Sequence, residues 1–528
     1  MIRLRQVKVS LDNRDKLLKK VANILHINEN DIKEYHIVKE SIDARNKGNI
    51  LLTYEIDILV DNEKKLLNKY GSNDIFKTPC EEFIFEVTGT KNLNTRPIIV
   101  GSGPAGLFCA YLLAEHGYNP LVIERGQCVE DRVKTIEEFW NTGKLNTNSN
   151  VQFGEGGAGT FSDGKLNTLV KDKKFIGKKV FEIFVEHGAP KEIMYLNKPH
   201  IGTDLLRQVI INMREKIISM GGEFRYNSCM TNIEIVNNEI KSICINNKET
   251  IPCDNLILAI GHSARDTFKI LYEKGIYMES KPFAIGLRIE HSQKMINKSM
   301  YGMEYHPYLG QANYKLTYKC KNGRGVYSFC MCPGGYVVNA SSEEGCLVVN
   351  GMSNHNRDSE NANSAIVVTV SSKDFGNNPL DGVEYQRKLE KATYELGNGK
   401  IPLQLYKDFC DDKKSISLGN IKAITKGDYT FANLNDILPS YISSSIKEAI
   451  LDFDKKIKGF ARDDALLLGI ESRTSSPVKI IRDDNFESNI KGIYPIGEGA
   501  GYAGGITTSA IDGIKMAVQF ARKYKVSN

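Results

Sequence analysis

The pattern of apolar and polar positions is clearest just after the first ninety residues. A short apolar run, Pro97 to Val100, has the length of a buried parallel strand. A longer apolar stretch, Pro104 to His116, follows and ends at Gly117, as expected of a helix with a C-cap glycine. A second short run, Leu121 to Ile123, ends at the acidic residue Glu124. This pattern predicts a strand, a helix and a second strand.

The turn between the first strand and the helix carries the spacing G-x-G-x-x-G. Its first glycine permits a tight turn, the second lets backbone approach a pyrophosphate, and the third lets helix and strand pack closely. The free N–H groups of the helix favour phosphate, and Glu124 lies at the distance expected for a ribose contact. A tight turn without a ligand is disfavoured, because strand, helix and acid are all in register. The residues predicted to bind a dinucleotide here are Gly101, Ser102, Gly103, Pro104, Ala105, Gly106, Glu124 and Arg125.

Residues 1–94 precede this motif and are predicted to form a small α/β domain. Leu4 to Val9 alternate like a strand, a helix is expected to end near Leu25, and Ile50 to Val60 favour another strand. No nucleotide motif occurs here. Within Met1 to Ile50, eleven Lys and Arg stand against seven Asp and Glu, which indicates a solvated basic face rather than an RNA-binding one.

A glycine-rich stretch, Val151 to Thr168, follows the first strand–helix–strand unit. Five of its residues are glycine, with small or polar neighbours, so the stretch is not core. It is either a flexible loop or one that lets backbone close on a flat ligand, and its place in the chain favours the second interpretation. The residues predicted to contact that ligand are Gly156, Gly157, Ala158, Gly159 and Asp163.

The C-terminal half is predicted to leave the nucleotide domain and return to it. Leu256 to Ile260 favour a buried strand ending at Gly261, whereas the stretch from Lys281 to about Pro477 alternates like a mixed β-rich domain. Near the end come a strand, the turn Gly497-Glu498-Gly499 and a long helix opening at Gly505 and Ile506. An acid at such a turn can bind a ribityl hydroxyl, and the helix N-terminus can stabilise the N1–C2=O edge of a reduced flavin.

The fold class predicted from these patterns is α/β, in three parts. A discontinuous Rossmann-like nucleotide domain is expected over 95–280 and 481–528, and a mixed β-rich substrate domain over 281–480 is inserted into it. The small α/β domain is expected over 1–94. A length of 528 residues suits this number of domains.

Composition and charge bear on the compartment and on the class of partner, but they do not indicate a reaction. The net charge of +6, from 70 basic and 64 acidic residues, is mild and does not imply nucleic acid. Eleven scattered cysteines, an odd count, and a polar N-terminus favour reduced thiols in a cytoplasm. No apolar run approaches eighteen residues, so no membrane span is expected, and no metal site is predicted.

Three segments in this order resemble a known superfamily. GSGPAG with Glu124, LILAIGHSARDT and YPIGEGAGYAGGI are similar to the first, middle and last FAD segments of flavoproteins related to glutathione reductase. Nearly the whole chain resembles a bacterial family of uncharacterised FAD-dependent dehydrogenases, through SIDARNK, NVQFGEGGAGTFSDGKLNT, GLRIEH, FCMCPGG, NGMSNHNRDSENANSA and ESRTSSP. A looser resemblance is to geranylgeranyl-reductase and fumarate-reductase types, which place a glycine loop near the flavin. One departure is Glu498, where the superfamily usually has Asp.

The resemblance implies FAD bound by a nucleotide domain in two sequence pieces, with no substrate implied. The cofactor residues it implies in the middle and last segments are Gly261, Gly497, Glu498, Gly505 and Ile506. Asp163 and Lys165 are expected near the polar edge of the flavin. No second G-x-G-x-x-G follows a strand, so a separate nicotinamide domain is not expected, although NAD(P)H remains a candidate transient donor.

Candidate catalytic residues lie in the inserted domain. Arg288 would bind a substrate carboxylate and His291 would donate a proton, with a structural ion pair between Arg288 and Glu290 as the alternative. Cys330 and Cys332 are either redox partners or packed thiols, and packed thiols are favoured because a C-x-C disulfide is strained. Arg357 is another carboxylate candidate, although a solvated loop charge is the favoured interpretation.

These observations lead to three functional hypotheses. The first is an FAD-dependent oxidoreductase that transfers hydride between flavin N5 and a small organic substrate. The second is a flavin-dependent RNA-modifying enzyme that uses the basic N-terminal domain, and the third is a non-catalytic flavin-bound sensor. Nucleic acid is the less expected partner, and the oligomeric state is left open.

Overall fold

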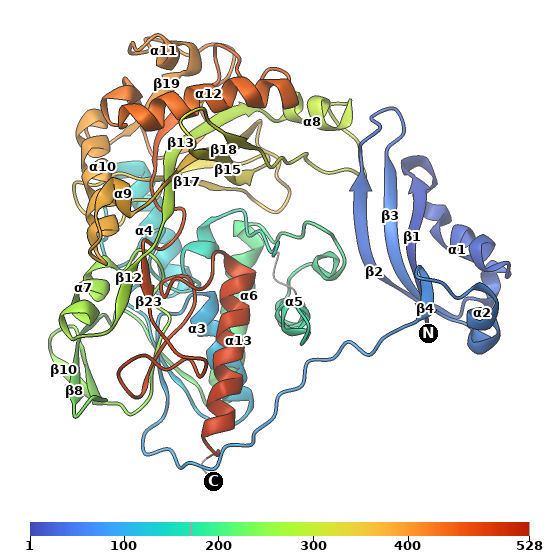
Figure 1. Ribbon diagram of the computed structural model, residues 1–528, viewed down its shortest axis with the longest axis horizontal. Coiled ribbons are helices and arrows are strands. Elements are labelled where there is room, and N and C mark those ends of the chain that lie inside the picture. The colour runs from blue at the N-terminus through green and yellow to red at the C-terminus, as the bar shows by residue number, and fades with distance from the viewer. Residues whose placement is uncertain (169–171, 527–528) are drawn as a thin grey trace.

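The computed structural model describes residues 1–168 and 172–526 (Figure 1). The nucleotide domain is built on a five-stranded parallel sheet. The strands follow the order β24-β11-β5-β6-β7. Their bounds are Ile98–Val100 (β5), Leu121–Ile123 (β6), Glu223–Arg225 (β7), Leu256–Leu258 (β11) and Ile493–Pro495 (β24). Because β24 pairs in parallel with β11, the far end of the chain completes the sheet that begins at residue 98.

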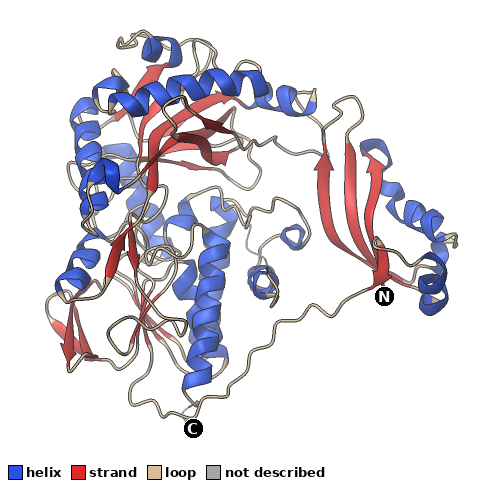
Figure 2. Cartoon of the chain, in the orientation of Figure 1, coloured by secondary structure: helices blue, strands red, loops and turns tan. Residues whose placement is uncertain are grey.

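Helices cover one face of this sheet and an antiparallel ribbon covers the other (Figure 2). On the helical side, α3 and α13 pack against each other and against α5 and α6. The helices of this domain are α3 (Pro104–Glu115), α4 (Val129–Thr142), α5 (Ile176–Glu186), α6 (Thr203–Ser219), α7 (Arg265–Glu273) and α13 (Ile506–Lys523). The ribbon is β8 (Met230–Val236), β9 (Glu239–Ile245) and β10 (Glu249–Pro252). Such a layered α/β core leaves the carboxyl ends of the strands open for a ligand.

The inserted domain is built on a seven-stranded mixed sheet in the order β14-β15-β18-β13-β22-β19-β21. Its strands are β13 (Phe283–Ser292), β14 (Thr317–Lys319), β15 (Gly325–Cys332), β18 (Asn361–Val370), β19 (Ile401–Leu405), β21 (Tyr429–Phe431) and β22 (Leu466–Glu471). Its helices are α8 (Gln293–Tyr301), α9 (Ser372–Phe375), α10 (Asp381–Gly397), α11 (Tyr406–Cys410) and α12 (Ser440–Lys456). The apolar face of α12 packs on β13 and β18, and β13 is buried from Phe283 to His291.

Two small sheets join the inserted domain to the nucleotide domain. The first is β16 (Tyr336–Asn339), β17 (Val349–Met352) and β20 (Thr425–Lys426), and the second is β12 (Met278–Ser280) with β23 (Val478–Ile480). Apolar residues of β16 and β17 pack against Ile136 of α4 and against Phe161, next to the glycine-rich stretch. The inserted domain therefore rests directly on the glycine-rich stretch.

The N-terminal domain is a four-stranded antiparallel sheet with two helices, at the right in Figure 1. Its elements are β1 (Ile2–Ser10), β2 (Glu34–Asp43), β3 (Leu51–Leu59), β4 (Ile75–Lys77), α1 (Leu17–Leu25) and α2 (Glu63–Tyr70). It has its own apolar core, which also takes in Leu309 from the inserted domain. A linker runs from it beneath the molecule to β5.

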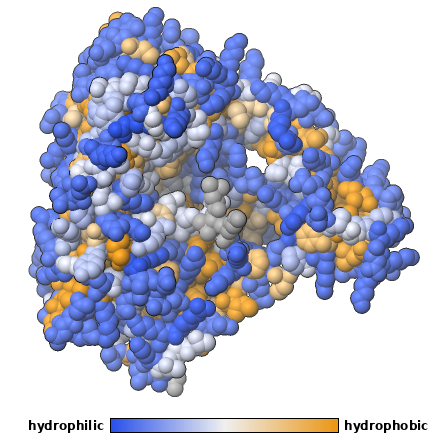
Figure 3. Space-filling view, viewed as in Figure 1, coloured by the Kyte–Doolittle hydropathy of each residue, from blue (hydrophilic) through white to orange (hydrophobic). Residues whose placement is uncertain are grey.

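The predicted mixed α/β class with a Rossmann-like domain is confirmed. The first strand, helix and second strand form where the pattern predicts them, and β8 and β9 form a hairpin with Val236 opposite Glu239. The face shown in Figure 3 is mainly hydrophilic, with apolar residues in separate patches. Among the described residues, no helix is both long and apolar enough to cross a membrane.

Candidate cofactor and substrate site

A cavity of about 570 Å³ lies at the carboxyl ends of the parallel strands. Its walls come from the turn after β5, the glycine-rich stretch, the segment after β11, the start of α13 and the inserted domain. This volume is within the range of cofactor and substrate sites. The position is the one where open α/β sheets bind their ligands.

Backbone approach in the first turn explains why glycine occurs there. Gly101 has φ +103, and a Cβ placed on it would lie 2.3 Å from the Ala259 carbonyl oxygen. A Cβ on Gly106 would lie 1.9 Å from the Gly101 carbonyl oxygen. Gly101 and Gly103 line the cavity with Pro104 and Ala105, whereas Gly106 and Ser102 lie behind the wall. The turn thus presents bare backbone and the N-terminus of α3 to a ligand.

Glu124 connects the first turn to the glycine-rich stretch. Its carboxylate accepts hydrogen bonds from the Ser102 N–H (2.9 Å) and hydroxyl (2.7 Å) and from the Gly154 N–H (3.1 Å). The same carboxylate lines the cavity at the end of β6. The neighbouring Arg125 also lines the cavity, and it is held by Asp266 at 2.5 Å. Both predicted residues therefore line the cavity at the carboxyl end of β6.

Arg132 fixes the glycine-rich stretch and was missed by the sequence analysis. Its guanidinium is fully buried and donates to the carbonyls of Asn150 (2.9 Å), Glu155 (2.7 Å) and Gly157 (2.9 Å). Burial lowers the pKa of Arg132 to about 9. Nothing in its polar helical segment distinguished this arginine from its solvated neighbours.

The glycine-rich stretch brings most of its predicted residues to the cavity. Gly157, Ala158, Gly159 and Asp163 line it, whereas Gly156 lies behind, with Thr160 Oγ1 only 2.1 Å from a Cβ placed on it. The segment is packed between α6 and the inserted domain, so it does not form a free loop. It therefore forms a wall over the middle of the cavity.

The last motif forms the part of the wall beside the first turn, since a Cβ on Gly497 would lie 2.7 Å from the Ala105 Cβ. Gly497, Glu498, Gly505 and Ile506 line the cavity, and a Cβ on Gly505 would meet no atom within 4 Å. Gly261, after β11, lines it as well and has the same open space. Burial raises the pKa of Glu498 to about 7, opposed by the charge of Lys281 and the Gly505 N–H. The N-terminus of α13 thus opens onto free cavity space.

Cys330 and Cys332 lie at a bulge in β15 on the inserted-domain side of the cavity. Cys330 is exposed to the cavity and has φ +42, unusual for a residue with a side chain. Burial raises the pKa of its thiol to about 12, partly opposed by the nearby Lys165 ammonium. Cys332 is buried, with its sulfur 3.9 Å from Lys165 Nζ and 3.7 Å from an Arg288 nitrogen. The packed-thiol interpretation fits Cys332 but not Cys330.

Arg288 lies directly behind this bulge and does not line the cavity. Its guanidinium, fully buried, pairs with Glu471 at 2.7 Å and donates to the Cys330 carbonyl at 2.5 Å. The predicted alternative of an ion pair with Glu290 is wrong, because Arg288 pairs with Glu471 and Glu290 bonds instead to Asn361. Arg288 therefore holds the bulge that carries the two cysteines.

His291 lies away from the cavity. It is fully buried in the core under α12, and its Nε2 lies 2.8 Å from the Phe460 carbonyl oxygen. Burial lowers its pKa to about 4. This placement does not favour the predicted role of proton donor, since the imidazole lies on the face of β13 opposite Arg288.

A cluster of charges occupies the cavity wall next to the cysteines. Arg357 makes two hydrogen bonds to Asp163, of 3.0 and 2.6 Å, and Lys165 Nζ lies 3.2 Å from the same carboxylate. Although burial opposes it, the two cations lower the pKa of Asp163 to about 2. The favoured interpretation of Arg357 as a solvated loop charge is wrong, because only 8% of this residue is exposed.

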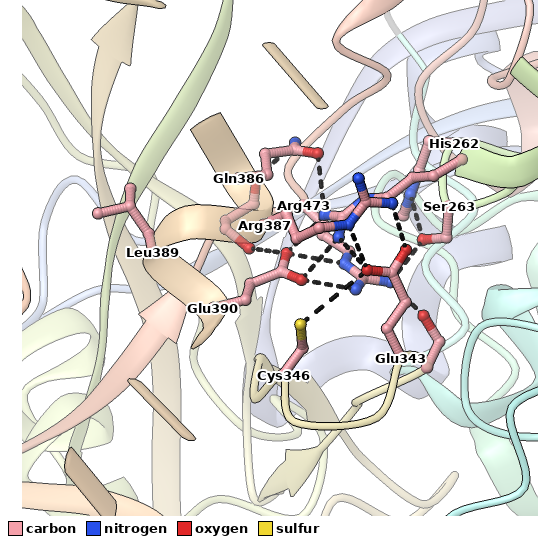
Figure 4. A network of polar contacts seen from close by, with 12 residues as sticks. His262, Ser263, Glu343, Cys346, Gln386, Arg387, Leu389, Glu390 and Arg473 are labelled. Atoms are coloured by element: carbon pink, nitrogen blue, oxygen red, sulfur yellow. Dashed lines mark hydrogen bonds and ion pairs between the residues drawn. The ribbon is translucent and has the colours of Figure 1, made fainter. Parts of the chain in front are cut away.

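A second buried network joins the segment after β11 to α10 (Figure 4). Glu390 of α10, fully buried, accepts from Arg265 at 2.7 Å and from Arg473 at 2.7 Å. Figure 4 shows His262 and Ser263 beside Arg473, and all three line the cavity. Burial and the Arg473 charge lower the pKa of His262 to about 3, so its ring is neutral. The network fastens the inserted domain to the cavity wall.

Comparison with known proteins identifies the class of the chain. Residues 95–281 match the pyridine nucleotide-disulphide oxidoreductase family, and residues 282–474 match the C-terminal domain-like region of FAD-dependent proteins. Residues 1–59 match a domain of unknown function. The whole chain is 48% identical over 530 residues to an uncharacterized protein of Clostridium beijerinckii, covering 99% of each. The chain belongs to the FAD-dependent oxidoreductase family.

FAD is therefore the cofactor, and the cavity suits it. Gly101, Gly103 and Gly505 present backbone without side chains to the cavity, and a dinucleotide needs such a close backbone approach near its phosphates. The acid Glu124 stands at one end and the N-terminus of α13 farther along. Among the described residues, no group of three His, Cys, Asp or Glu side chains could hold a metal ion.

The solved structures compared with this chain share little sequence identity with it and have low TM-scores. Escherichia coli quinol fumarate reductase FrdA is 10% identical, over 82% of this chain and 70% of that chain, with a TM-score of 0.37. Glycine oxidase from Bacillus cereus is 10% identical, over 80% and 94%, with a TM-score of 0.34. Halogenase PltM in complex with FAD is 10% identical, over 81% and 69%, with a TM-score of 0.38. Likenesses at this level add nothing about substrate.

Proposed function

We propose that the protein is an FAD-dependent oxidoreductase that transfers hydride between flavin N5 and a small organic substrate held by the inserted domain. The observation that carries this proposal is the continuity of the cavity. One space extends from the turn after β5 to side chains of the inserted domain such as Cys330 and Arg357. FAD, when bound, supplies hydride chemistry at N5 of its ring. The chain supplies binding, orientation and charge.

We assign the part of the cavity under the inserted domain to the substrate. This substrate chamber is defined by Asp163, Lys165, Lys198, Lys315, Cys330 and Arg357. The nucleotide end, with Glu124 and Arg125, lies at the carboxyl end of β6 instead. A cofactor spanning from Glu124 past the N-terminus of α13 would leave the chamber free for a second molecule.

Two groups in the chamber are candidates for handling a proton. Cys330 keeps its proton at neutral pH, since burial raises its pKa to about 12, and it is therefore a poor nucleophile. Lys165 is charged, because the Asp163 carboxylate outweighs burial and raises the lysine pKa. Both could donate a proton to a reduced substrate. Arg288 acts through Cys330 and is a positioning residue.

The proposal is tested by anaerobic reduction of the purified protein with NADH and with NADPH. We expect a yellow protein that releases FAD on denaturation, loses its flavin absorbance with at least one donor, and regains it when an acceptor from a substrate panel is added. A protein that cannot take up FAD would refute the proposal. Bound FAD that no nicotinamide or substrate reduces would favour the flavin-bound sensor instead.

A further inference from the structure

The substrate chamber carries an excess of positive charge. Four cationic side chains line it, Lys165, Lys198, Lys315 and Arg357. Among the described lining residues of the chamber, the carboxylate that faces them is Asp163. Both Arg357 and Lys165 already contact that carboxylate, at 2.6 and 3.2 Å. The charge of the other two lysines is therefore not balanced by Asp163.

Lys198 and Lys315 are both exposed where they line the cavity, and neither has a carboxylate partner among the residues that the structure describes. Lys198 Nζ donates to the neutral amide oxygen of Asn313 at 2.6 Å, and burial together with the Arg357 charge lowers its pKa. Lys315 has no hydrogen bond or ion pair to any residue that the structure describes. They come from different parts of the fold, one before α6 and one before β14, yet they line the same chamber.

The nucleotide end of the cavity gives a contrast. There Arg125 is neutralised by Asp266 at 2.5 Å, and elsewhere in the cavity wall Arg473 is paired with Glu390 at 2.7 Å. The excess charge is thus confined to the chamber and is not a general property of the cavity. Amide side chains of Asn167, Asn313 and Asn350 line the same region and can complete hydrogen bonds to an oxyanion.

We infer that the substrate is an anion, and that Lys198 and Lys315 hold its carboxylate or phosphate group while its reacting carbon faces the flavin. This inference rests on the proposed function and adds the substrate class to it. An incoming oxyanion would replace the water around two lysine ammonium groups and gain two charge-assisted hydrogen bonds. Neutral molecules of the same shape gain neither, so the chamber should discriminate by charge.

The experiment titrates the FAD-loaded protein with benzoate, with its neutral analogue benzamide, and with inorganic phosphate. Binding is read from the change in flavin absorbance and from the shift in the thermal unfolding midpoint. We expect benzoate or phosphate to bind at least tenfold more tightly than benzamide, and higher ionic strength to weaken that binding. A preference for benzoate indicates a carboxylate substrate, and a preference for phosphate a phosphorylated one.

A double variant, Lys198→Gln with Lys315→Gln, should weaken anion binding at least tenfold while keeping the FAD content. Lys319→Gln is the matched control, because Lys319 is exposed on the nearby β14 and does not line the cavity. Equal binding of benzoate and benzamide, no binding of either anion, or an unaffected double variant would overturn the inference. A reducible flavin with no anion preference refutes this inference alone, whereas failure to bind FAD refutes the proposed function.

Discussion

Gly106 lies where α3 packs so closely against the turn after β5 that there is no space for a methyl group. Alanine in a helix is normally favoured over glycine by about 1 kcal/mol. Here the added Cβ would lie 1.9 Å from the Gly101 carbonyl oxygen. We expect Gly106→Ala to lower the free energy of unfolding by about 1–3 kcal/mol and to reduce the bound FAD, measured by denaturant unfolding and by absorbance.

Gly177→Ala in α5 is the matched control for this substitution. Its added Cβ would lie 3.1 Å from the Asp172 carboxylate, the end of a side chain that accepts hydrogen bonds from Ile176 and Gly177 and has to shift by only a few tenths of an ångström. The control should stay near the stability of the unchanged protein, with full FAD content. A Gly106→Ala variant as stable and as yellow as the control would show that the close approach of helix and turn is dispensable.

Glu498 gives the protein without FAD a stability that depends on pH. Its pKa is raised from 4.5 to about 7 in the fold, so the folded state favours the protonated acid. Stability from this group is therefore retained below about pH 4.5 and lost as the pH rises to about 7. Glu498→Gln should remove that loss, and we expect the variant to gain about 1–2 kcal/mol over the unchanged protein between pH 5 and 8, after allowing for solvent access.

The measurement for Glu498 is urea unfolding of FAD-free protein at a series of pH values. Glu344→Gln, the same substitution at an exposed glutamate, serves as the control. Its free energy of unfolding should equal that of the unchanged protein at each pH. A variant whose advantage does not change with pH would contradict the assignment of a raised pKa to Glu498.

At the scale of elements, the sequence pattern correctly predicted the helices and strands that are formed by residues close together in the chain. The β5–α3–β6 unit follows from short apolar runs and three glycines close in sequence. β13 is different, because it is buried on both faces and its pattern cannot tell which face meets the cavity. Arg288 and His291 therefore looked equivalent in the sequence, although only Arg288 lies on the cavity side.

Long-range partners were also beyond the sequence. Arg288 pairs with Glu471, 183 residues away, instead of the adjacent Glu290. Most of the predicted cofactor residues line the cavity because they belong to turns that close within a few residues. The substrate side depends on how the inserted domain folds back on the glycine-rich stretch, which no local pattern specifies.

Glu390 of α10 pairs with the buried Arg265 and Arg473, and we expect its substitution to destabilise the fold strongly. Although burial opposes it, the two arginines hold the pKa of Glu390 well below its usual range, so the carboxylate is charged. Glu390→Gln would leave the buried Arg473 without a carboxylate partner, and Arg265 with only Glu343, at 3.2 Å. We expect a loss of about 3–5 kcal/mol in the free energy of unfolding, measured with guanidinium chloride.

Glu384→Gln on the same helix is the control for Glu390. Glu384 is exposed and pairs with Arg387 near the surface, so its loss should cost less than about 1 kcal/mol. Limited proteolysis should also cut the Glu390→Gln variant faster around α10. Equal, small losses for both substitutions would show that the network in Figure 4 is not what fastens the inserted domain.

At the scale of the whole molecule, the N-terminal domain is joined to the rest by few contacts. Glu40 of β2 exchanges two backbone hydrogen bonds with the segment before α6, to Tyr195 (2.8 Å) and Asn197 (2.9 Å). Arg14 lies over the Tyr308 ring at 5.4 Å. The buried apolar residue of this contact is Leu309, which is 5% exposed and comes from the inserted domain, and the partly buried Tyr301 and Met303 pack against the same N-terminal core.

Leu309→Ala should therefore loosen the docking of the N-terminal domain without disturbing the cofactor site. Removing this buried side chain costs about 2–5 kcal/mol, and that loss falls on the contact between domains. We expect faster proteolysis of the linker before β5 and faster hydrogen exchange in β2, with unchanged FAD content. Leu451→Ala, at a site 59% exposed on α12, is the matched control and should change neither. Loss of FAD from the Leu309→Ala variant alone would mean that the N-terminal domain also supports the cofactor cavity, and that the two are not independent.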